Sequence, residues 1–239
     1  VLASMLEGRT GFVAGDGLEN QPDDNPQVGQ AADLVPPVGS VPDRAEQYLQ
    51  RAILDALRDS GLGDSAPDRT SLVLGTTLGG IRHLGDGMRK DCLTPYTRLS
   101  NGSVNMHTLQ GTGLPIGGVS VSAACASGLT AIINGALLLQ SGEADVVIAG
   151  GYDPISEFSL GGFMSLRLVA PERTMPFEAE RVGMKVAEGY GIVVLERAED
   201  ARARNARPLG WLAGSGERSD AFHLTQPQKQ LYLYPSYVF

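Results

Sequence analysis

The chain has 239 residues, of which 42% are hydrophobic, 19% charged and 6% aromatic, and its formal net charge is −8. This composition excludes a disordered tail, and 31 glycines without a three-residue period exclude collagen. An acidic chain with no block of basic residues is poorly suited to binding nucleic acid or an anionic membrane surface. Its apolar stretches are short and interrupted by glycine or charge, so no membrane-spanning segment is expected.

We expect no signal peptide, because the chain does not start with basic residues followed by a long apolar run; it starts with VLASMLEGRTG. It also lacks an initiating Met, which is compatible with a natural protein that begins earlier. Two cysteines, Cys92 and Cys125, are too few for a disulfide framework. The sequence therefore predicts a reducing, cytoplasmic setting.

The first half of the chain passes from loop to helix to strand. Residues 16–42 are rich in Asp, Asn, Gln, Pro and Gly, which predicts a long surface loop. Apolar residues at helical spacing predict a helix over residues 43–62, closed by a glycine. The β-branched run at residues 70–77 predicts a buried strand. Residues 80–110 are mixed, with a helix expected near 104–110.

The second half has the clearest pattern. Residues 117–124 alternate in polarity and predict a strand that ends near Ala124, followed by a helix that stops at Ser141 and Gly142. Further elements are then expected: buried strands at 144–151 and 191–196, a charged helix at 196–206 and a weaker strand at 208–217. Strand and helix alternate, and the strands are too apolar to have a solvent-exposed face. We therefore expect an α/β fold with an at least partly parallel sheet that is covered by helices.

Cys125 lies where this predicted strand meets the predicted helix, and its neighbours in AACASG are all small. A sharp strand-to-helix turn needs small neighbours, and it exposes one side chain at the top of the sheet, as in the nucleophile elbow of serine hydrolases. The N–H groups and partial positive charge of the helix start favour a thiolate and could hold an oxyanion. A lone cysteine is more commonly a small buried apolar residue, but this context favours a nucleophile.

The sequence around Cys125 resembles the β-ketoacyl synthases of fatty-acid and polyketide synthesis, within the thiolase-like superfamily. The matching blocks are VSAACASG at 121–128, GTTLGG at 75–80, GGFMSLRL at 161–168, the segment 176–196 and SDAFHLTQP at 219–227. They occur in family order over roughly residues 7–228, which makes the match specific. The resemblance implies a thiolase-like mixed sheet covered by helices, and mainly the first of the family's two pseudo-repeated halves, with the first strand missing.

The resemblance also implies a mechanism and partners. Cys125 would accept an acyl group from an acyl carrier protein or coenzyme A, and a decarboxylated malonyl-type extender would then attack that thioester. Phe163 matches a position that lines the family's acyl pocket, although a core aromatic is an equally good interpretation. The backbone N–H of the nucleophile serves the family as an oxyanion donor. Family members pair through a sheet edge near the nucleophile, which implies a homodimer or heterodimer.

The sequence departs from the family in its histidines. The family uses two histidines from its second half, whereas the three here are His83, His107 and His223, none in a matching context. His223 matches a family segment well before the first catalytic histidine, and the glycine-rich turn that supplies the second oxyanion donor is also missing. We therefore expect acyl transfer to Cys125 but no condensation by this chain alone.

The loop at 176–191 departs too. Glu178 stands where the family usually has Asp, and Val182, Met184 and Lys185 replace an acid and two apolar residues. Lys185 is most simply a solvated loop charge. Glu188 is expected to be buried and paired, with a structural role.

The remaining candidates favour structural interpretations. His107 is expected to be a core or interface residue, His83 a surface residue and Cys92 inert. GTTLGG lacks the ending of a P-loop, and GTGLPIGG does not fit a dinucleotide-binding turn, so no cofactor is expected. No HExxH or paired CxxC occurs, so no metal site is expected either.

Two surface features stay open at this stage. The first is a set of four arginines near the end of the chain: Arg197, Arg202, Arg204 and Arg207. They could form a basic patch that binds an acidic carrier protein, although a solvated helix face with acid–base pairs is the simpler explanation. We divide the chain into a synthase N-terminal domain at 1–228 and an atypical aromatic tail at 229–239, which is either an interface strand or a foreign extension.

Two alternatives to an acyltransferase also remain. One is a non-catalytic partner or scaffold subunit of a synthase, although such subunits in the polyketide branch typically lack the nucleophilic cysteine. The other is an incomplete, inactive piece of a longer enzyme.

Overall fold

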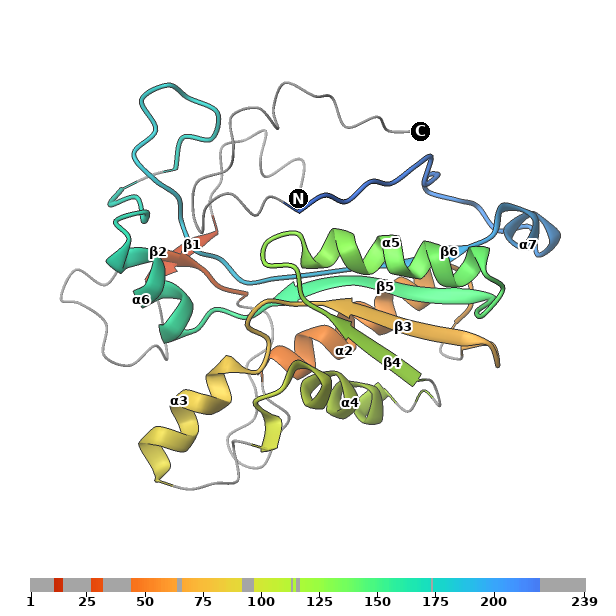
Figure 1. Ribbon diagram of the computed structural model, residues 1–239, viewed down its shortest axis with the longest axis horizontal. Helices are drawn as coiled ribbons and strands as arrows, with labels where there is room; N and C mark the ends of the chain where they lie inside the picture. The colour runs from red at the N-terminus through yellow and green to blue at the C-terminus, as the bar shows by residue number, and fades with distance from the viewer. Residues whose placement is uncertain are drawn as a thin grey trace.

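The computed structural model of the protein describes residues 11–14, 27–31, 44–63, 66–91, 97–112, 114, 117–172 and 174–219. A four-stranded sheet forms the centre of this part of the chain (Figure 1). Its spatial order is β4-β3-β5-β6, and its strands are β3 (Thr70–Gly75), β4 (Gly117–Val121), β5 (Val146–Asp153) and β6 (Gly189–Glu196). β3 pairs in parallel with β4 and β5, whereas β6 is antiparallel to β5. The prediction of an α/β fold with a partly parallel sheet is confirmed.

Helices cover both faces of the sheet. α5 (Ser127–Gln140) packs on β3 and β5 from one side, while α2 (Arg44–Asp59) and α4 (Asn101–Thr112) lie on the other (Figure 1). Gly61 and Gly142 follow α2 and α5 with φ of 77° and 73°. Because such positive φ angles suit glycine, these two residues end the helices where the sequence predicted.

Alternation along the central strands divides the core into two layers. Leu72, Leu74 and Ile148 are fully buried on the side of α2 and α4. The intervening Val73 and Val147 are buried under α5. Both faces of β3 and β5 are therefore apolar because both are covered, as expected for the inner strands of a parallel sheet.

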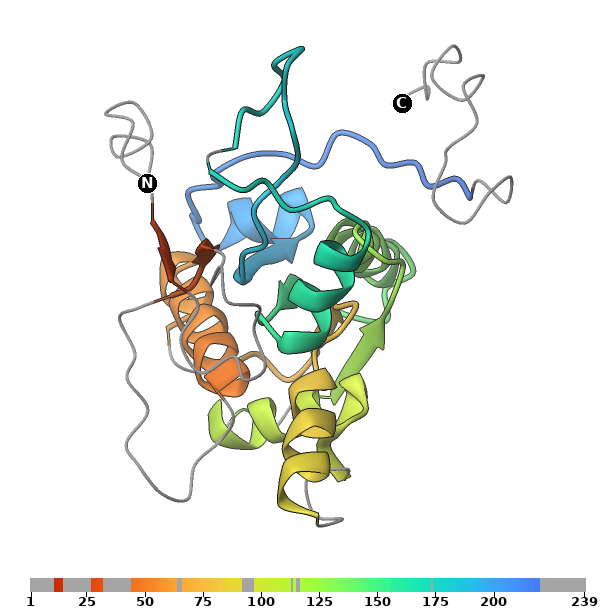
Figure 2. The same cartoon turned by 90° about the vertical axis from the view of Figure 1, so that its left-hand side faces the viewer.

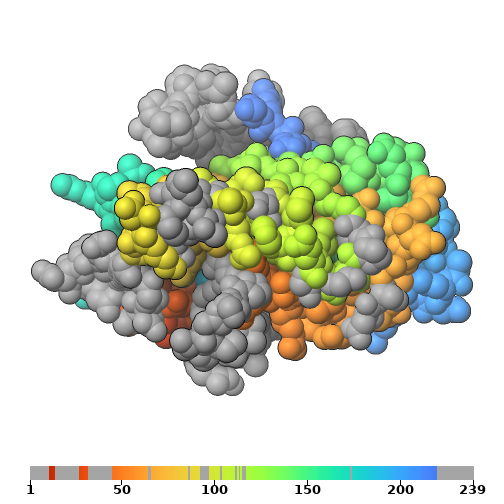
Figure 3. Space-filling view, turned by 90° about the horizontal axis from the view of Figure 1, so that it is seen from below, coloured from red at the N-terminus to blue at the C-terminus, as the bar shows by residue number. Residues whose placement is uncertain are grey.

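The remaining helices are shorter and lie at the ends of the sheet. α3 (Ile81–Lys90) and α6 (Glu157–Ser165) lie at one end and are nearest the viewer in Figure 2, whereas α7 (Ala198–Ala203) follows β6. Seen from below, parts of α3, α4 and α2 are exposed at the surface (Figure 3). Arg89 of α3 contacts Glu157 of α6 at 2.9 Å, which ties those two helices together.

Two regions in the first half of the chain differ from the prediction. Within the expected loop at 16–42, β2 (Gln27–Gly29) pairs antiparallel with β1 (Phe12–Ala14), because its Val28 is fully buried and needs a paired backbone. Helix α3 lies in the segment expected to be mixed, and its sequence IRHLGDGMRK contains two glycines, which weaken the helical pattern.

The expected strand at 208–217 is not a strand. The segment runs extended over the surface without a strand partner among the described residues, and Leu209 is 96% exposed. Apolar content alone does not make a strand, because a strand also needs a neighbour for its backbone N–H and C=O groups. The expected lack of the family's first strand, and the aromatic tail at 229–239, lie outside the described residues.

Candidate active site around Cys125

Cys125 lies in the short connection between β4 and α5, at the end of the sheet where the parallel strands terminate (Figure 1). Open α/β sheets place their ligands at this carboxyl edge. The thiol is free and Cys125 is exposed. The prediction that a strand–turn–helix exposes this side chain at the top of the sheet therefore agrees with the structure.

The turn itself is held in an uncommon backbone conformation. Ala124 has φ of 48°, in the left-handed region that non-glycine residues rarely adopt. The N–H of Ala126 donates to the carbonyl of Ala123 at 3.0 Å, and the N–H of Ser127 donates to the carbonyl of Ala124 at 3.1 Å. The side chain of Ser127 closes the turn again, because its Oγ donates to Ala124 at 2.6 Å and accepts from the N–H of Ala123 at 2.9 Å.

Glycines explain why α5 starts so close to the sheet. A Cβ atom at Gly75, the last residue of β3, would lie 2.0 Å from the carbonyl oxygen of Ser127. A Cβ atom at Gly151 in β5 would lie 2.8 Å from the Cα of Gly128. The first turn of α5 is therefore in backbone contact with two strands, and any larger residue at these positions would push Cys125 outward.

An open groove of about 440 Å³ lies beside the thiol. Its described lining is mostly backbone and small side chains from β3, β5, β6 and the start of α5: Gly75, Ala124, Cys125, Ser127, Gly128, Leu129, Ile132, Gly150, Gly151, Tyr152, Asp153, Ala187, Gly189 and Gly191. A groove with so few bulky side chains leaves space next to the sulfur for a substrate.

Asp153 is the acidic residue of this lining, and sequence reasoning missed it. One carboxylate oxygen, Oδ1, accepts hydrogen bonds from the Thr76 hydroxyl at 2.7 Å, the Thr77 N–H at 3.0 Å and the Leu78 N–H at 2.9 Å. Asp153 ends β5, and Thr76 directly follows the neighbouring β3. Polar residues after adjacent parallel strands were the signal that could have found this pair.

The second predicted site residue, Phe163, lies on α6 and is half-buried. The helix begins at a capping box in which the Ser156 hydroxyl accepts from the Ser159 N–H at 3.1 Å and the Ser159 hydroxyl accepts from the Ser156 N–H at 3.2 Å. Phe163 is not among the described residues that line the groove beside Cys125. Its role in an acyl pocket stays a prediction.

Two predictions about surface residues were wrong. His83 is only 7% exposed, because α3 turns it inward rather than leaving it on a loop. Lys185 is only 9% exposed, and its Nζ donates to the carbonyl of Pro171 at 3.3 Å. The buried lysine follows Met184, whose backbone pairs with Leu168 and Ala170, so the side chain enters the protein beside that pairing.

The other candidates agree with their structural interpretations or cannot be placed. His107 is half-buried on α4 and is not among the described residues around the groove. Glu188 accepts a hydrogen bond from the N–H of Ala31 at 2.7 Å, which is a structural contact. Cys92 and His223 lie outside the described residues.

Two of the four arginines of the expected basic patch, Arg197 and Arg204, are paired with acids of the chain. Arg197 donates to Asp145 at 2.5 Å and to the carbonyl of Ala144 at 2.8 Å. The hydrogen bond with Asp145 raises the pKa of Arg197 and lowers that of Asp145. Arg197 also pairs with Asp200 at 2.8 Å, so a solvated face with acid–base pairs describes this residue.

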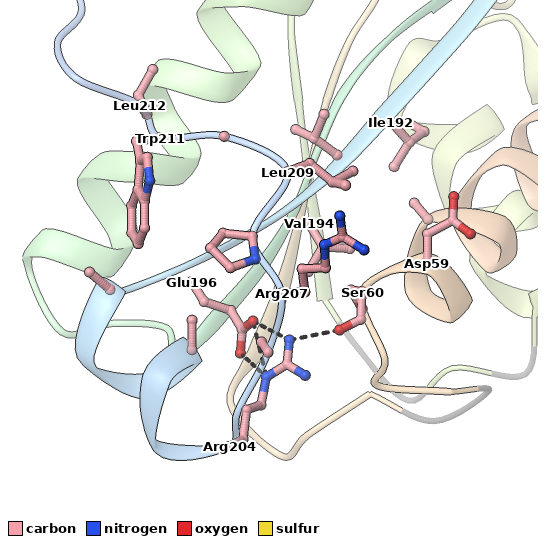
Figure 4. A pocket seen from close by; sticks show the side chains of 17 residues that line it. Asp59, Ser60, Ile192, Val194, Glu196, Arg204, Arg207, Leu209, Trp211 and Leu212 are labelled. Carbon is pink, nitrogen blue, oxygen red and sulfur yellow. Dashed lines mark hydrogen bonds and ion pairs between the residues drawn. The ribbon is translucent and has the colours of Figure 1, made fainter.

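Arg204 is engaged in the same way, in a pocket of about 250 Å³ between α2, β6 and α7 (Figure 4). Its guanidinium pairs with Glu196 and donates to the carbonyl of Ser60 at 2.8 Å. The hydrogen bond with Glu196 raises the pKa of Arg204. The pocket is remote from Cys125, and none of its lining residues belongs to the groove beside the thiol.

Comparison with known proteins decides the family. The family model described as "Beta-ketoacyl synthase, N-terminal domain" matches residues 40–201. The chain belongs to the β-ketoacyl synthase family.

The 3-oxoacyl-[acyl-carrier-protein] synthase 2 of Rhizobium meliloti (strain 1021) is 34% identical over 208 residues, which cover 76% of this chain and 48% of that protein. Nodulation protein E of Rhizobium meliloti is 31% identical over 239 residues, covering 95% of this chain and 57% of that protein. The chain thus spans about half the length of these relatives.

Solved ketosynthases share the thiolase-like fold. A β-ketoacyl synthase from Burkholderia phymatum STM815 superposes with a TM-score of 0.80 at 24% identity, over 96% of this chain and 62% of that one. The ishigamide ketosynthase/chain length factor gives a TM-score of 0.75 at 25% identity, over 86% and 55% of the two chains. A type II polyketide synthase ketosynthase, solved in complex with its acyl-carrier protein, gives 0.62 at 24% identity, over 79% and 51%. These matches confirm the predicted fold class.

Two kinds of feature are absent from the described residues. They contain no helix long and apolar enough to cross a membrane. They also contain no group of three or more His, Cys, Asp or Glu side chains placed to hold a metal ion.

Proposed function

We propose that this chain performs the acyl-accepting step of a β-ketoacyl synthase, with Cys125 as the nucleophile. The observation that carries the proposal is the exposed thiol of Cys125 at a strand–turn–helix junction, beside a groove of about 440 Å³. Membership of the synthase family supports the same reaction class.

In this step the Cys125 sulfur attacks the carbonyl carbon of an acyl thioester. The bond between that carbon and the carrier sulfur breaks, so the acyl group becomes a thioester of Cys125 and the carrier leaves as a thiol that takes up the proton lost from Cys125. The negative charge on the carbonyl oxygen in the tetrahedral intermediate needs a donor nearby. The Cys125 N–H supplies it, since it has no acceptor among the described residues.

Condensation belongs to the whole synthase in this proposal. The relatives are about twice as long as this chain, and the two family histidines come from the second half of family members. The chain's own histidines do not match those positions. We therefore assign acyl transfer alone to this chain. Decarboxylation of the extender is assigned to the histidines of the family's second half.

An acyl carrier protein is the acyl donor that we propose, with coenzyme A thioesters as the simpler chemical equivalent. One fold neighbour is a ketosynthase in complex with its acyl-carrier protein, which supports a carrier-bound donor. Because Arg197 and Arg204 are paired with acids of the chain itself, the carrier's acidic surface is expected to meet other cations.

We also propose that the chain pairs with a second ketosynthase-fold subunit through the edge of β4. Among the described strands β4 is hydrogen-bonded only to β3, which leaves its other edge open to a further strand. Val119 of β4 is 56% exposed and, with Leu137 of α5, lines an apolar groove of about 490 Å³. An open edge beside exposed apolar side chains fits a homodimer or heterodimer interface.

The test of the acyl-transfer proposal is a mass measurement. The chain is incubated with an acyl-coenzyme A or acyl carrier protein, and the adduct is located by intact mass and peptide mapping. We expect one acyl group on Cys125, lost in Cys125→Ala and kept in the matched control Cys92→Ala. Label elsewhere, with Cys125 unmodified, would overturn the assignment.

A scaffold role is the second candidate, favoured by the fold match to a ketosynthase/chain length factor. It predicts that Cys125→Ala leaves the activity of a complete partner synthase unchanged. A loss of that activity on Cys125→Ala would exclude it.

A further inference from the structure

Three hydrogen bonds meet on one carbonyl oxygen beside the nucleophile. The carbonyl of Ala124 accepts from the N–H of Ser127 at 3.1 Å, from the Ser127 hydroxyl at 2.6 Å and from the Thr77 hydroxyl at 2.9 Å. The two Ser127 bonds are local to the turn. Thr77 comes from the connection after β3, 47 residues earlier in the chain, and so ties the turn to the rest of the sheet.

The peptide unit that is held in this way contains the N–H of Cys125. The carbonyl of residue 124 and the N–H of residue 125 belong to one rigid plane and point in opposite directions in a trans peptide. Fixing the oxygen of Ala124 therefore fixes the direction of the Cys125 N–H. Donors on the carbonyl also polarise the amide and strengthen its N–H as a donor.

Thr77 is itself held in place by Asp153. The N–H of Thr77 donates to Oδ1 of Asp153 at 3.0 Å, next to the hydroxyl of Thr76 and the N–H of Leu78 on the same oxygen. One carboxylate at the end of β5 thus fixes the turn after β3, and that turn presents the Thr77 hydroxyl to the peptide before Cys125.

The strain in the turn explains why such a tether is needed. Ala124 adopts φ of 48°, where an alanine side chain is crowded by its own backbone. Without a bond from outside the turn, the peptide between Ala124 and Cys125 could relax by rotation, and the direction of its N–H would change.

We propose that Thr77, oriented by Asp153, is a positioning residue that aims the Cys125 N–H at the oxyanion formed during acyl transfer. This inference rests on the proposed function of Cys125. It assigns to Thr77 no contact with the substrate, and its effect is on the tetrahedral intermediate rather than on access to the thiol.

The test compares two reactions of the same thiol. Acylation by an acyl-coenzyme A passes through an oxyanion, whereas alkylation by iodoacetamide is a direct displacement at carbon that forms none. Thr77→Val removes the hydroxyl and keeps the branched shape, Thr77→Ser keeps a hydroxyl, and Thr130→Val removes an exposed hydroxyl of α5 that donates to Glu217. Both rates are measured for each variant, with thermal unfolding as a check of folding.

We expect Thr77→Val to acylate about tenfold more slowly, a smaller loss than the 10²–10³ typical of deleting an oxyanion donor outright. Its alkylation rate should stay near that of the unmodified chain. Thr77→Ser should recover most of the acylation rate, and Thr130→Val should change neither rate.

The outcomes separate the two proposals. Equal loss of both rates in Thr77→Val, or no loss of acylation, overturns the positioning role while leaving Cys125 as the nucleophile. If the unmodified chain is alkylated at Cys125 but never acylated, the proposed function fails and the positioning role falls with it.

Discussion

A Cβ atom on Gly75 would lie 2.0 Å from the carbonyl oxygen of Ser127, so the last residue of β3 and the first residue of α5 are in direct backbone contact. This contact sets how deeply the helix that follows Cys125 sits against the sheet. The carbonyl is backbone and cannot rotate aside as a flexible side chain could.

Gly75→Ala is therefore expected to destabilise the protein by about 1–3 kcal/mol or more, because the added methyl group overpacks a fixed contact. The free energy of unfolding, measured in urea, checks this. Gly161→Ala is the matched control, since nothing lies within 4 Å of a Cβ at that position of α6. Alanine there should be neutral or stabilising by up to about 1 kcal/mol. Equal effects of the two substitutions would contradict the packing argument.

Ser156→Ala should weaken α6, the helix that carries Phe163. The Ser156 side chain is buried and caps the helix, so its loss is expected to cost about 1 kcal/mol. Chemical denaturation provides the measurement. The control is Ser165→Ala, whose exposed hydroxyl donates only to the carbonyl of Gly162 within the same helix. A loss in the control as large as in Ser156→Ala would mean that the cap contributes nothing specific.

The pair of Arg197 and Asp145 should make stability depend on pH in the acid range. The hydrogen bond from Arg197 lowers the pKa of Asp145 below its ordinary value of 3.8. A carboxyl whose folded pKa is depressed stabilises the protein above its unfolded pKa, and this stabilisation is lost as the pH falls through the folded pKa.

Asp145→Asn should therefore lower the melting temperature at neutral pH, and the difference from the unmodified chain should shrink as the pH falls below 3.8. Melting curves over a pH series test this. Glu172→Gln, an exposed acid on the loop after Ala170, is the control and should leave the melting temperature unchanged at every pH. A constant deficit of Asp145→Asn across the series would show that the substitution acts through packing rather than through charge.

Val119→Lys should weaken the proposed pairing through β4. A charge placed in the apolar groove would have to be buried by a second subunit, and we expect the dissociation constant to rise by about tenfold or more. Sedimentation velocity over a range of concentrations measures it. Met88→Lys, on the exposed surface of α3, introduces the same charge on a helix that packs against α6, and it should leave association unchanged. An association unaffected by Val119→Lys would remove β4 from the interface.

Local sequence pattern predicted the elements that local physics determines. The helix after Asp43 and the helix after Cys125 are closed by glycines, the strands β3, β5 and β6 contain short apolar runs, and the structure contains each of these elements. The segment 208–217 has apolar content without a strand partner, and no local pattern reports whether a partner strand is present.

Of the candidate site, the sequence predicted only the position of Cys125. Cys125 carried a local signal, namely small residues between a strand and a helix. Thr77 and Asp153 reach the site through tertiary contacts 47 and 76 residues apart in sequence, so only the sheet topology brings them together. The burial of His83 and Lys185 likewise depends on packing between distant segments. The roles of Cys125 and Phe163, the domain boundary at residue 228 and a cytoplasmic setting stay predictions.

The groove beside the nucleophile is walled largely by main chain, with glycines contributed by β3, β5, β6 and α5. To admit bulkier acyl groups in the proposed reaction, protein engineers have few large side chains there to shorten, namely Leu129, Ile132 and Tyr152. Every replacement of such a glycine adds atoms and narrows the opening. Variant libraries aimed at broader chain-length acceptance should therefore leave this wall intact and diversify side chains further from the sulfur.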